Sequence, residues 1–348
     1  MNNFASTTGR IQLQQGQFDF TNPQDPPFIE FDLVGDAGGR SFFALAPNLA
    51  VTAAHNLFDF DISSTRLSII NDLSLDNQVR EENGFANSSF RDASFLRGYD
   101  TRAVQRAEQN LGLTFDDASR DIATFVTNVA FNTSQLTGLA VFLNPTQLEG
   151  QPITALGFPD DVGNTFTTVS GNGSSLINDR VLISTDLGIS TGFSGGPTFT
   201  STSNLTGTDD QFAIGVNSQF IPGSTESVIS LFTESDIRFF AEIVADSGID
   251  TDELPRYLFV GSSDPAVEIE DISGTRLRDV IVGGNANESL FGRDASDELL
   301  GGSGNDTLIG DGALDSPDVA GDDTLDGGDG FDIVDYLDAA GSACLCPL

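Results

Sequence analysis

Residues 191–197 read Thr-Gly-Phe-Ser-Gly-Gly-Pro, and residues 51–55, far upstream, read Val-Thr-Ala-Ala-His. The hydroxyl of Ser194 is a weak nucleophile until a neighbouring base takes its proton, and glycines beside it let backbone N–H groups approach a developing oxyanion. His55 is the only histidine of the chain, so it has no competitor as the base. Together the two runs predict nucleophilic acyl transfer.

The two runs resemble the motifs T-A-A-H and G-x-S-G-G-P of the chymotrypsin-like serine proteases, in the order found in that family. The resemblance covers roughly residues 28 to 245. It implies a two-barrel, all-β protease domain with a closing helix, and a protein or peptide substrate. Position 193 is Phe, where animal digestive members carry an Asp that captures a freed N-terminus. The chain is therefore more similar to bacterial members of the family.

The resemblance also implies a catalytic triad. His55 would be general base and then general acid, Asp121 would orient the imidazole, and Ser194 would attack the scissile carbonyl. Asp121 is favoured over its acidic neighbours because it leads directly into the apolar run Ile122-Ala123. The backbone N–H groups of Gly192 and Ser194 are expected to line the oxyanion hole.

Alignment of the motifs gives expectations for the specificity pocket. Gly188 would lie at its base, Ile189 beside it, and Asn217 to Phe220 along its wall. The base carries no Asp, and a buried cation without a partner is costly, so cleavage after Arg or Lys is disfavoured. We expect small or medium apolar residues at the cleaved bond.

The rest of this region consists of short apolar runs separated by Gly, Asn, Asp and Pro, a pattern typical of strands in an all-β barrel or sandwich. Helical spacing of apolar residues predicts two helices, over residues 101–111 and 233–247. The expected strands are Phe28–Val34, Ser41–Leu45, Arg66–Ile70, Ile122–Thr127, Pro152–Phe158, Arg180–Ser184 and Phe212–Val216.

The C-terminal part is periodic, with windows of nine residues in which the sixth position is acidic and the eighth apolar. The windows that begin at Gly301 and Gly327 match the pattern G-G-x-G-x-D-x-U-x in full. The pattern resembles the RTX nonapeptide repeat, which implies a calcium-binding parallel β-roll. The windows are GTRLRDVIV from Gly274, GGNANESLF from Gly283, GRDASDELL from Gly292, GGSGNDTLI from Gly301, DVAGDDTLD from Asp318 and GGDGFDIVD from Gly327.

Calcium prefers an all-oxygen shell, which the sixth-position carboxylates and the turn carbonyls would supply. The expected ligands are Asp279, Asp297, Asp306, Asp323 and Asp332, with Glu288 as a weaker candidate. The eighth positions would stack into a thin core, too small to offset conformational entropy alone, so we expect Ca²⁺ binding to be coupled to folding. The alternative is a disordered tail rich in Gly and Asp, which the strict nine-residue spacing of the windows disfavours.

Composition narrows the possible partners. The formal net charge is −37, with fifteen basic residues that are all arginine, so we expect no nucleic-acid partner. Cation binding, a saline habitat and a disordered tail could each explain the acidity. No run approaches the roughly 20 apolar residues of a membrane span. The two cysteines, Cys344 and Cys346, are poorly spaced for a mutual disulfide.

The N-terminus lacks a basic n-region and an apolar h-region, so we expect no cleaved signal peptide. Similarity to RTX proteins implies export by type I secretion machinery and an extracellular location. The expected organisation is a tail or pro-segment (1–27), a protease domain (28–247), a linker (248–273), a β-roll (274–338) and a C-terminal tail (339–348).

Three functions remain open from the sequence. The leading one is a secreted, calcium-stabilised serine endopeptidase with a His-Asp-Ser triad. The first alternative is a catalytically inactive protease homologue that acts as a calcium-dependent adhesin or binding module, since a fold can persist without turnover. The second alternative keeps the triad and directs it at an ester or at one specific partner.

Overall fold

A computed structural model describes most of the chain, which divides into two compact units. The first unit comprises residues 1–136, 152–199 and 215–231, and the second comprises residues 137–151, 200–214 and 232–348. The structure describes residues 8–15, 37–61, 66–75, 88–95, 114–127, 136–159, 166–207, 211–220, 225–245, 254–311, 321–335 and 344–345.

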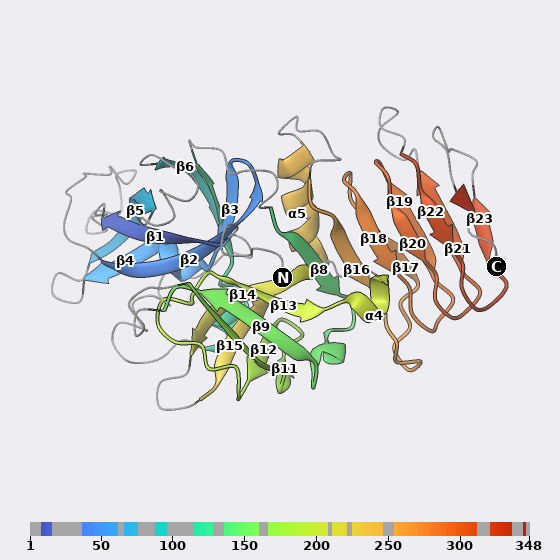
Figure 1. The fold of residues 1–348 in the computed structure, drawn as a ribbon, viewed down its shortest axis with the longest axis horizontal. Helices are drawn as coiled ribbons and strands as arrows, with labels where there is room; N and C mark the ends of the chain where they lie inside the picture. The colour runs from blue at the N-terminus through green and yellow to red at the C-terminus, as the bar shows by residue number, and fades with distance from the viewer. Residues whose placement is uncertain are drawn as a thin grey trace, which may run out of the picture. The chain divides into compact units, whose positions relative to one another are not determined.

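The first unit begins with an antiparallel barrel, drawn in blue in Figure 1. Its six strands follow one another by hydrogen bonding, and the pairing of the first strand with the last closes the ring. A seventh strand, β4 (Phe58–Asp61), pairs with β5. The ring runs through β1 (Thr8–Gln15), β2 (Ala37–Ala46), β3 (Leu49–Thr52), β7 (Ala123–Thr127), β6 (Ser88–Phe95) and β5 (Arg66–Leu75). The core of this barrel includes an edge-to-face contact between Phe42 and Phe125, whose ring centroids lie 5.4 Å apart.

A second antiparallel arrangement lies mainly in the first unit, and residues 200–201 of β13 and 211–214 of β14 belong to the second. Its strands β12 and β15 are buried along their whole length, as expected for strands covered on both faces. The order of pairing is β10 (Thr167–Asn172), β9 (Pro152–Gly157), β13 (Pro197–Ser201), β14 (Gln211–Phe220), β15 (Ser227–Leu231), β12 (Val181–Ser184) and β11 (Ser175–Ile177).

The second unit is built from parallel strands. One sheet starts where Phe212 and Ala213 of β14 pair with β8, and it continues strand by strand to β24. Its members are β8 (Gly138–Phe142), β16 (Tyr257–Val260), β18 (Asp279–Val282), β20 (Glu298–Leu300), β22 (Thr324–Asp326) and β24 (Cys344–Leu345). A separate four-stranded parallel sheet holds β17 (Asp271–Ser273), β19 (Ser289–Arg293), β21 (Thr307–Asp311) and β23 (Ile333–Asp335).

Consecutive repeats alternate between these two sheets, so each turn stacks on the turn two repeats away, as the nine-residue phase predicts. The eighth-position side chains form the interior of the roll. Five of them are at most 2% exposed, namely Ile281, Leu290, Leu299, Leu308 and Leu325. The all-β fold with a C-terminal parallel β-roll is therefore confirmed.

The helices are few and short in the described part of the chain. The longest is α5 (Glu234–Ala245), which buries Ile237, Phe240 and Val244 and confirms the helix expected near residues 233–247. No described helix has both the length and the apolar character that a membrane crossing requires. The helix expected over residues 101–111 and the strand expected at Phe28–Val34 lie outside the described residues.

Two predicted segments differ in the structure. The expected tail at residues 1–27 contains β1, which pairs with both β2 and β5. The expected linker at 248–273 contains β17 and also β16, whose four residues are all buried between β8 and β18. The apolar run of β16 lacks the nine-residue motif but satisfies parallel neighbours on both sides, which is why periodicity alone missed it.

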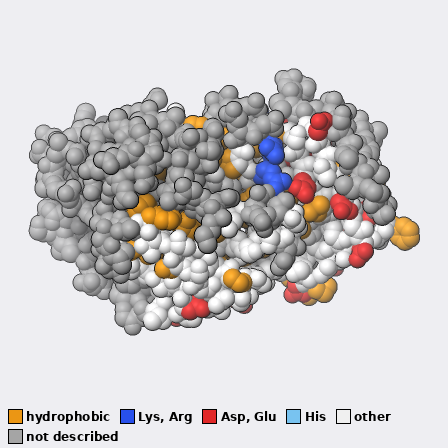
Figure 2. All heavy atoms as spheres, viewed as in Figure 1, with side chains coloured by type: hydrophobic (Ala, Val, Ile, Leu, Met, Phe, Trp, Pro, Cys, Tyr) orange, Lys and Arg blue, Asp and Glu red, His pale blue; other side chains and the backbone are white. Residues whose placement is uncertain are grey.

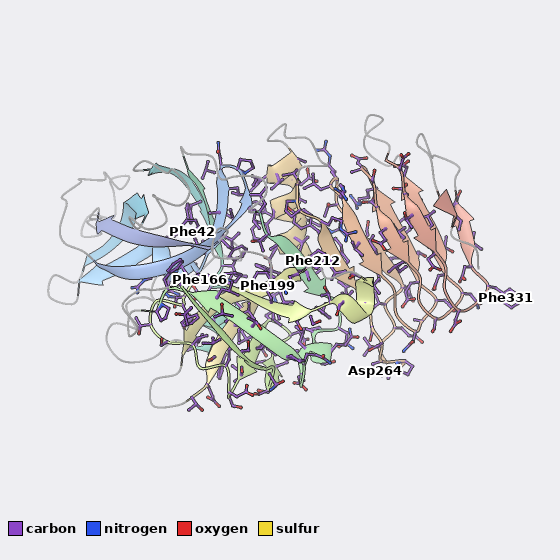
Figure 3. All side chains as sticks on the ribbon, in the orientation of Figure 1. Phe42, Phe166, Phe199, Phe212, Asp264 and Phe331 are labelled. Carbon is purple, nitrogen blue, oxygen red and sulfur yellow. The ribbon has the colours of Figure 1, made fainter. Side chains whose placement is uncertain are left out.

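The far end of the roll is open among the described residues. Phe331 is 89% exposed and Ile333 is 62% exposed, and Figure 3 shows the Phe331 ring projecting away from the repeats. Figure 2 shows acidic side chains scattered over the visible face of the repeats.

Candidate active site

His55 and Asp121 meet within the first unit. His55 lies in a short 3₁₀ helix, Ala54–Leu57, directly after β3, and its Nδ1 atom is 2.7 Å from Asp121 Oδ2. The backbone N–H of His55 donates to the other carboxylate oxygen, Asp121 Oδ1, at 2.9 Å. Two contacts to one carboxylate fix both the position and the ring orientation of the imidazole, the role expected of the acidic member of a triad.

Local structure explains why Asp121 is placed so well. The short helix α3 (Phe115–Ala118) begins with a capping box between Thr114 and Asp117, and its last turn ends as the backbone N–H of Asp121 donates to Ala118 O at 3.1 Å. Asp121 is fully buried, and the strand β7 starts two residues later. Asp117 caps its own helix, and Asp121 is the carboxylate that contacts His55.

Ser218, which the sequence suggested only as part of the pocket wall, is a third donor to this carboxylate. Its hydroxyl donates to Asp121 Oδ2 at 2.5 Å, and its own carbonyl accepts the Ser194 hydroxyl at 2.9 Å. Ser218 therefore connects the acid to the nucleophile. The sequence signal that could have indicated this role is the polar pair Asn217-Ser218 directly after the apolar run Phe212–Val216. Both residues of the pair are fully buried in the structure.

The nucleophile loop depends on glycines with positive φ. Gly192 has φ +98° and Gly195 has φ +89°, values that L side chains rarely adopt. The carbonyl of Ser194 accepts two hydrogen bonds, from Ser41 N at 2.9 Å and from Asn56 Nδ2 at 2.8 Å. Among the described residues, no carbonyl accepts the N–H of Gly192 or of Ser194. Both donors are thus available to a substrate oxyanion.

The residues expected to form the specificity pocket differ in their exposure to solvent and in their hydrogen bonds. Gly188 is exposed with φ +69°, and Ile189 is buried with its N–H donating to Ser227 Oγ at 3.1 Å. Asn217 is fully buried, and its amide bonds Thr198 Oγ1 at 2.5 Å and Leu156 O at 3.1 Å. These bonds make Asn217 a structural link between strands, so its amide does not line a pocket wall. The side chain of Phe220 lies outside the described part.

The sixth-position carboxylates of the roll form two ladders in the second unit. In each ladder a carboxylate oxygen accepts the backbone N–H of the sixth residue two repeats earlier, at distances between 2.8 and 3.0 Å. One ladder is Asp279, Asp297 and Asp323, and the other is Glu288, Asp306 and Asp332.

Four of these six groups keep a second oxygen that is buried and without a hydrogen-bond partner among the described residues: Glu288, Asp297, Asp306 and Asp332. Burial raises the pKa of Glu288 to about 7 and that of Asp323 to about 6, and it raises the pKa of Asp297 and Asp306 as well. Unpaired buried oxygens are costly, so these positions favour a bound cation or a proton.

Asp279 differs from the other members of its ladder. Its Oδ2 atom accepts both the backbone N–H and the hydroxyl of Thr275, the latter at 3.0 Å. Burial nevertheless raises its pKa to about 8. The carbonyls of Ser273 and Gly274, at the start of the same turn, accept the guanidinium of Arg238 from α5. In the first turn of the roll, the carboxylate of Asp279 and the carbonyls of Ser273 and Gly274 therefore have hydrogen-bond donors from the protein itself.

The oxygen atoms around the turns of the roll show whether these residues could hold Ca²⁺. No group of three or more His, Cys, Asp or Glu side chains converges on one point within the described residues. The unpartnered carboxylate oxygens instead lie beside glycine-rich turns whose carbonyls are further oxygen donors, which fits a hard cation such as Ca²⁺. Gly301 shows how tight this packing is, because a Cβ there would stand 2.6 Å from Asp306 Oδ2.

A match to a known protein family covers most of the first unit and parts of the second. Residues 40–207 match the family model of the trypsin-like peptidase domain, a stretch that contains His55, Asp121 and Ser194. The match covers just under half of the chain and supports a serine peptidase. No curated protein matches the chain.

Two solved structures are similar to this chain at low identity. One is a Glu endopeptidase in complex with MPD, with 16% identity, a TM-score of 0.43, and coverage of 68% of this chain and 97% of that chain. Another is a serine endoprotease from Yersinia pestis, with 13% identity, a TM-score of 0.40, and coverage of 70% of this chain and 64% of that chain.

Proposed function

We propose that the protein is a serine endopeptidase that hydrolyses peptide bonds with the triad His55, Asp121 and Ser194. The observation that carries the proposal is the two-point contact between His55 and the buried Asp121, in the same unit as the Ser194 loop. A histidine held in one tautomer by a buried carboxylate is the arrangement that activates a serine.

The proposed reaction gives each of these groups one role. Ser194 Oγ turns from Ser218 O towards His55 Nε2, transfers its proton to the imidazole and attacks the scissile carbonyl. The oxyanion is received by the N–H groups of Gly192 and Ser194, while Asp121 stabilises the imidazolium. His55 then protonates the leaving amine, and water hydrolyses the acyl-enzyme by the reverse proton transfers.

The non-catalytic alternative has one observation in its favour. In the resting structure the Ser194 hydroxyl donates to Ser218 O at 2.9 Å. A hydroxyl locked there would leave a binding module that has the protease fold and the roll but no turnover. Labelling of Ser194 by a fluorophosphonate separates the two functions, because only an activated serine reacts. Comparing the hydrolysis of casein with that of a small ester tests the third possibility, a triad directed at esters.

We propose that the roll binds Ca²⁺ through Asp297, Asp306 and Asp332, with Glu288 and Asp323 as further ligands. The support is the set of buried, unpartnered carboxylate oxygens beside glycine-rich turns. Bound calcium would supply positive charge and an oxygen-coordinating centre that holds adjacent turns together. We no longer include Asp279, because Thr275 already satisfies its Oδ2 atom.

We also propose that the protein works outside the cell after export by type I secretion machinery. Calcium sites of extracellular modules have dissociation constants of roughly 10⁻⁴–10⁻³ M, a range that an extracellular medium fills and a cytoplasm does not. Immunodetection in culture supernatant and in washed cells tests this location.

For cleavage specificity, we propose that the enzyme prefers small or medium apolar residues at the cleaved bond, since Gly188 offers no charge. A peptide-library digest dominated by Arg, Lys or Glu at that position would overturn this proposal.

The test of the proposed function is a casein digestion assay on the wild type and on Ser194→Ala, each with calcium and with a chelator. We expect turnover by the wild type in calcium and none by Ser194→Ala. Ser201→Ala is a matched control, because Ser201 is exposed and its hydroxyl contacts only Ser203 Oγ, at 3.2 Å, in the described residues. A wild type that leaves casein intact in calcium would contradict the proposal.

A further inference from the structure

Three polar side chains are fully buried behind the nucleophile loop: Ser41, Thr52 and Asn56. Burying polar groups in a barrel core costs free energy unless each finds partners. All three belong to the first unit, and none has a role in the triad chemistry described above. Their hydrogen bonds indicate what they do.

Ser41 contacts the nucleophile loop twice. Its hydroxyl donates to Gly192 O at 2.7 Å, and its backbone N–H donates to Ser194 O at 2.9 Å. The same hydroxyl accepts the N–H of Phe158 at 3.1 Å, which fixes the direction of its proton towards Gly192. Ser41 thus holds the two carbonyls of the loop that belong to the residues whose N–H groups form the oxyanion hole.

Thr52 and Asn56 connect this contact to the segment that carries the general base. Thr52 Oγ1 donates to Ser41 O at 2.8 Å, and Asn56 Nδ2 bonds both Thr52 Oγ1 at 2.9 Å and Ser194 O at 2.8 Å. The approach is close enough that a Cβ at Gly195 would collide with Ser41, Thr52 and Asn56. The histidine segment and the serine loop are therefore tied by direct bonds.

We propose that Ser41 is a positioning residue for the oxyanion hole, a role that rests on the proposed function of the site. Gly192 lies at φ +98°, and its flexible backbone has many alternatives to the orientation in which its N–H faces the substrate. Bonds from Ser41 to the carbonyls of Gly192 and Ser194 restrain the backbone of the loop at both of these residues. Preorganised donors stabilise the transition state more than the bound substrate, so the effect falls on kcat.

The test uses Ser41→Ala, which removes only the hydroxyl and keeps the bond from N–H to Ser194 O. Ser41→Cys retains a weaker donor of similar size, and Ser262→Ala is the control, since it removes an equally buried hydroxyl from the second unit. The full chain in calcium is assayed with p-nitrophenyl acetate for kcat, KM and the pH dependence of kcat/KM. Thermal unfolding monitors folding, and Ser41→Cys serves if Ser41→Ala does not fold.

We expect kcat of Ser41→Ala to fall about 10- to 100-fold with KM changed less than about threefold, and Ser41→Cys to lie between it and the wild type. The midpoint of the acid limb of the pH profile should not move, because His55 and Asp121 are untouched. A kcat within about twofold of the wild type, or a shifted acid limb, would overturn the inference. A wild type without any hydrolysis contradicts the proposed function itself and, with it, this inference.

Discussion

The two units treat buried carboxylates in opposite ways. In the first unit Asp121 is fully buried and accepts three hydrogen bonds, from His55 N, His55 Nδ1 and Ser218 Oγ. In the second unit Asp306 is equally buried, yet its Oδ2 atom has no partner among the described residues. The first arrangement is complete with protein groups alone, whereas the second lacks positive charge.

Because of this difference, we expect the two units to depend differently on bound cations. A satisfied buried carboxylate keeps a site organised without added ions, while unpaired oxygens in a thin core favour unfolding until a cation neutralises them. We therefore expect the catalytic groups to be insensitive to calcium in themselves and the roll to depend on it.

The largest expected effect is a loss of activity when the fully hydrogen-bonded carboxylate of Asp121 is replaced. Asp121→Asn keeps the shape of the side chain but presents an amide to His55, which favours the wrong tautomer, so kcat should fall on the order of 10⁴-fold. Steady-state hydrolysis of p-nitrophenyl acetate measures it. Asp117→Asn is the matched control, because Asp117 caps α3 and does not contact His55. Equal losses in the two variants would remove Asp121 from the triad.

The second effect concerns calcium. Saturating calcium at 100 to 1,000 times Kd should stabilise the roll by about 3–4 kcal/mol per site, seen as a raised unfolding temperature of the second unit by calorimetry. Asp306→Ala should abolish part of this gain, whereas Asp279→Asn should keep it, because Thr275 satisfies Asp279. Equal loss in the two variants would contradict the distinction between them.

The third effect is a pH dependence of the calcium-free roll. Burial raises the folded-state pKa of Asp323 to about 6, of Glu288 to about 7 and of Asp279 to about 8, above unfolded values near 4. The folded state therefore binds more protons than the unfolded state, and stability falls as the pH rises from about 5 to about 8. Urea unfolding in chelator should show a loss of about 2 kcal/mol or more over this range. A calcium-free roll that becomes more stable with rising pH would contradict the assignment.

The smallest effect concerns Arg238, the internal cation of the first turn. Its guanidinium bonds the carbonyls of Ser273 and Gly274 and lies 5.8 Å from the centre of the Phe259 ring. Arg238→Ala should lower the free energy of unfolding of the second unit by about 1–2 kcal/mol, equally with and without calcium. Arg276→Ala should cost less, because Arg276 is about two-fifths exposed and its ion pairs with Glu242 and Asp294 are long, at 3.4 and 3.5 Å. A destabilisation that calcium fully reverses would show that Arg238 acts only through the metal sites.

The sequence predicted those parts of the molecule whose chemistry demands particular residues at particular spacings. A single histidine and a glycine-flanked serine made His55 and Ser194 the catalytic candidates, and the nine-residue phase predicted the roll and its buried eighth positions. Asp121 was found through its strand, and the structure adds that the rival Asp117 serves as a cap.

The residues that escaped prediction act through tertiary contacts that leave no local pattern. Ser41 and Ser218 are ordinary serines in strands, and only the fold brings them to Gly192 and Asp121. β1 lies in a polar segment and β16 lacks the nine-residue motif, so neither carries the pattern from which strands were predicted. Asn217 was assigned to a pocket wall from its place in the alignment, although a buried amide in an apolar strand more often joins strands.

The most direct test of the central claim is labelling with a fluorophosphonate probe followed by mass spectrometry of the modified peptide. With calcium present, we expect the label on Ser194 of the wild type, and none on that residue in His55→Ala. Absence of label from wild-type Ser194, or equal labelling when His55 is replaced, would contradict the assignment of an activated serine to this fold.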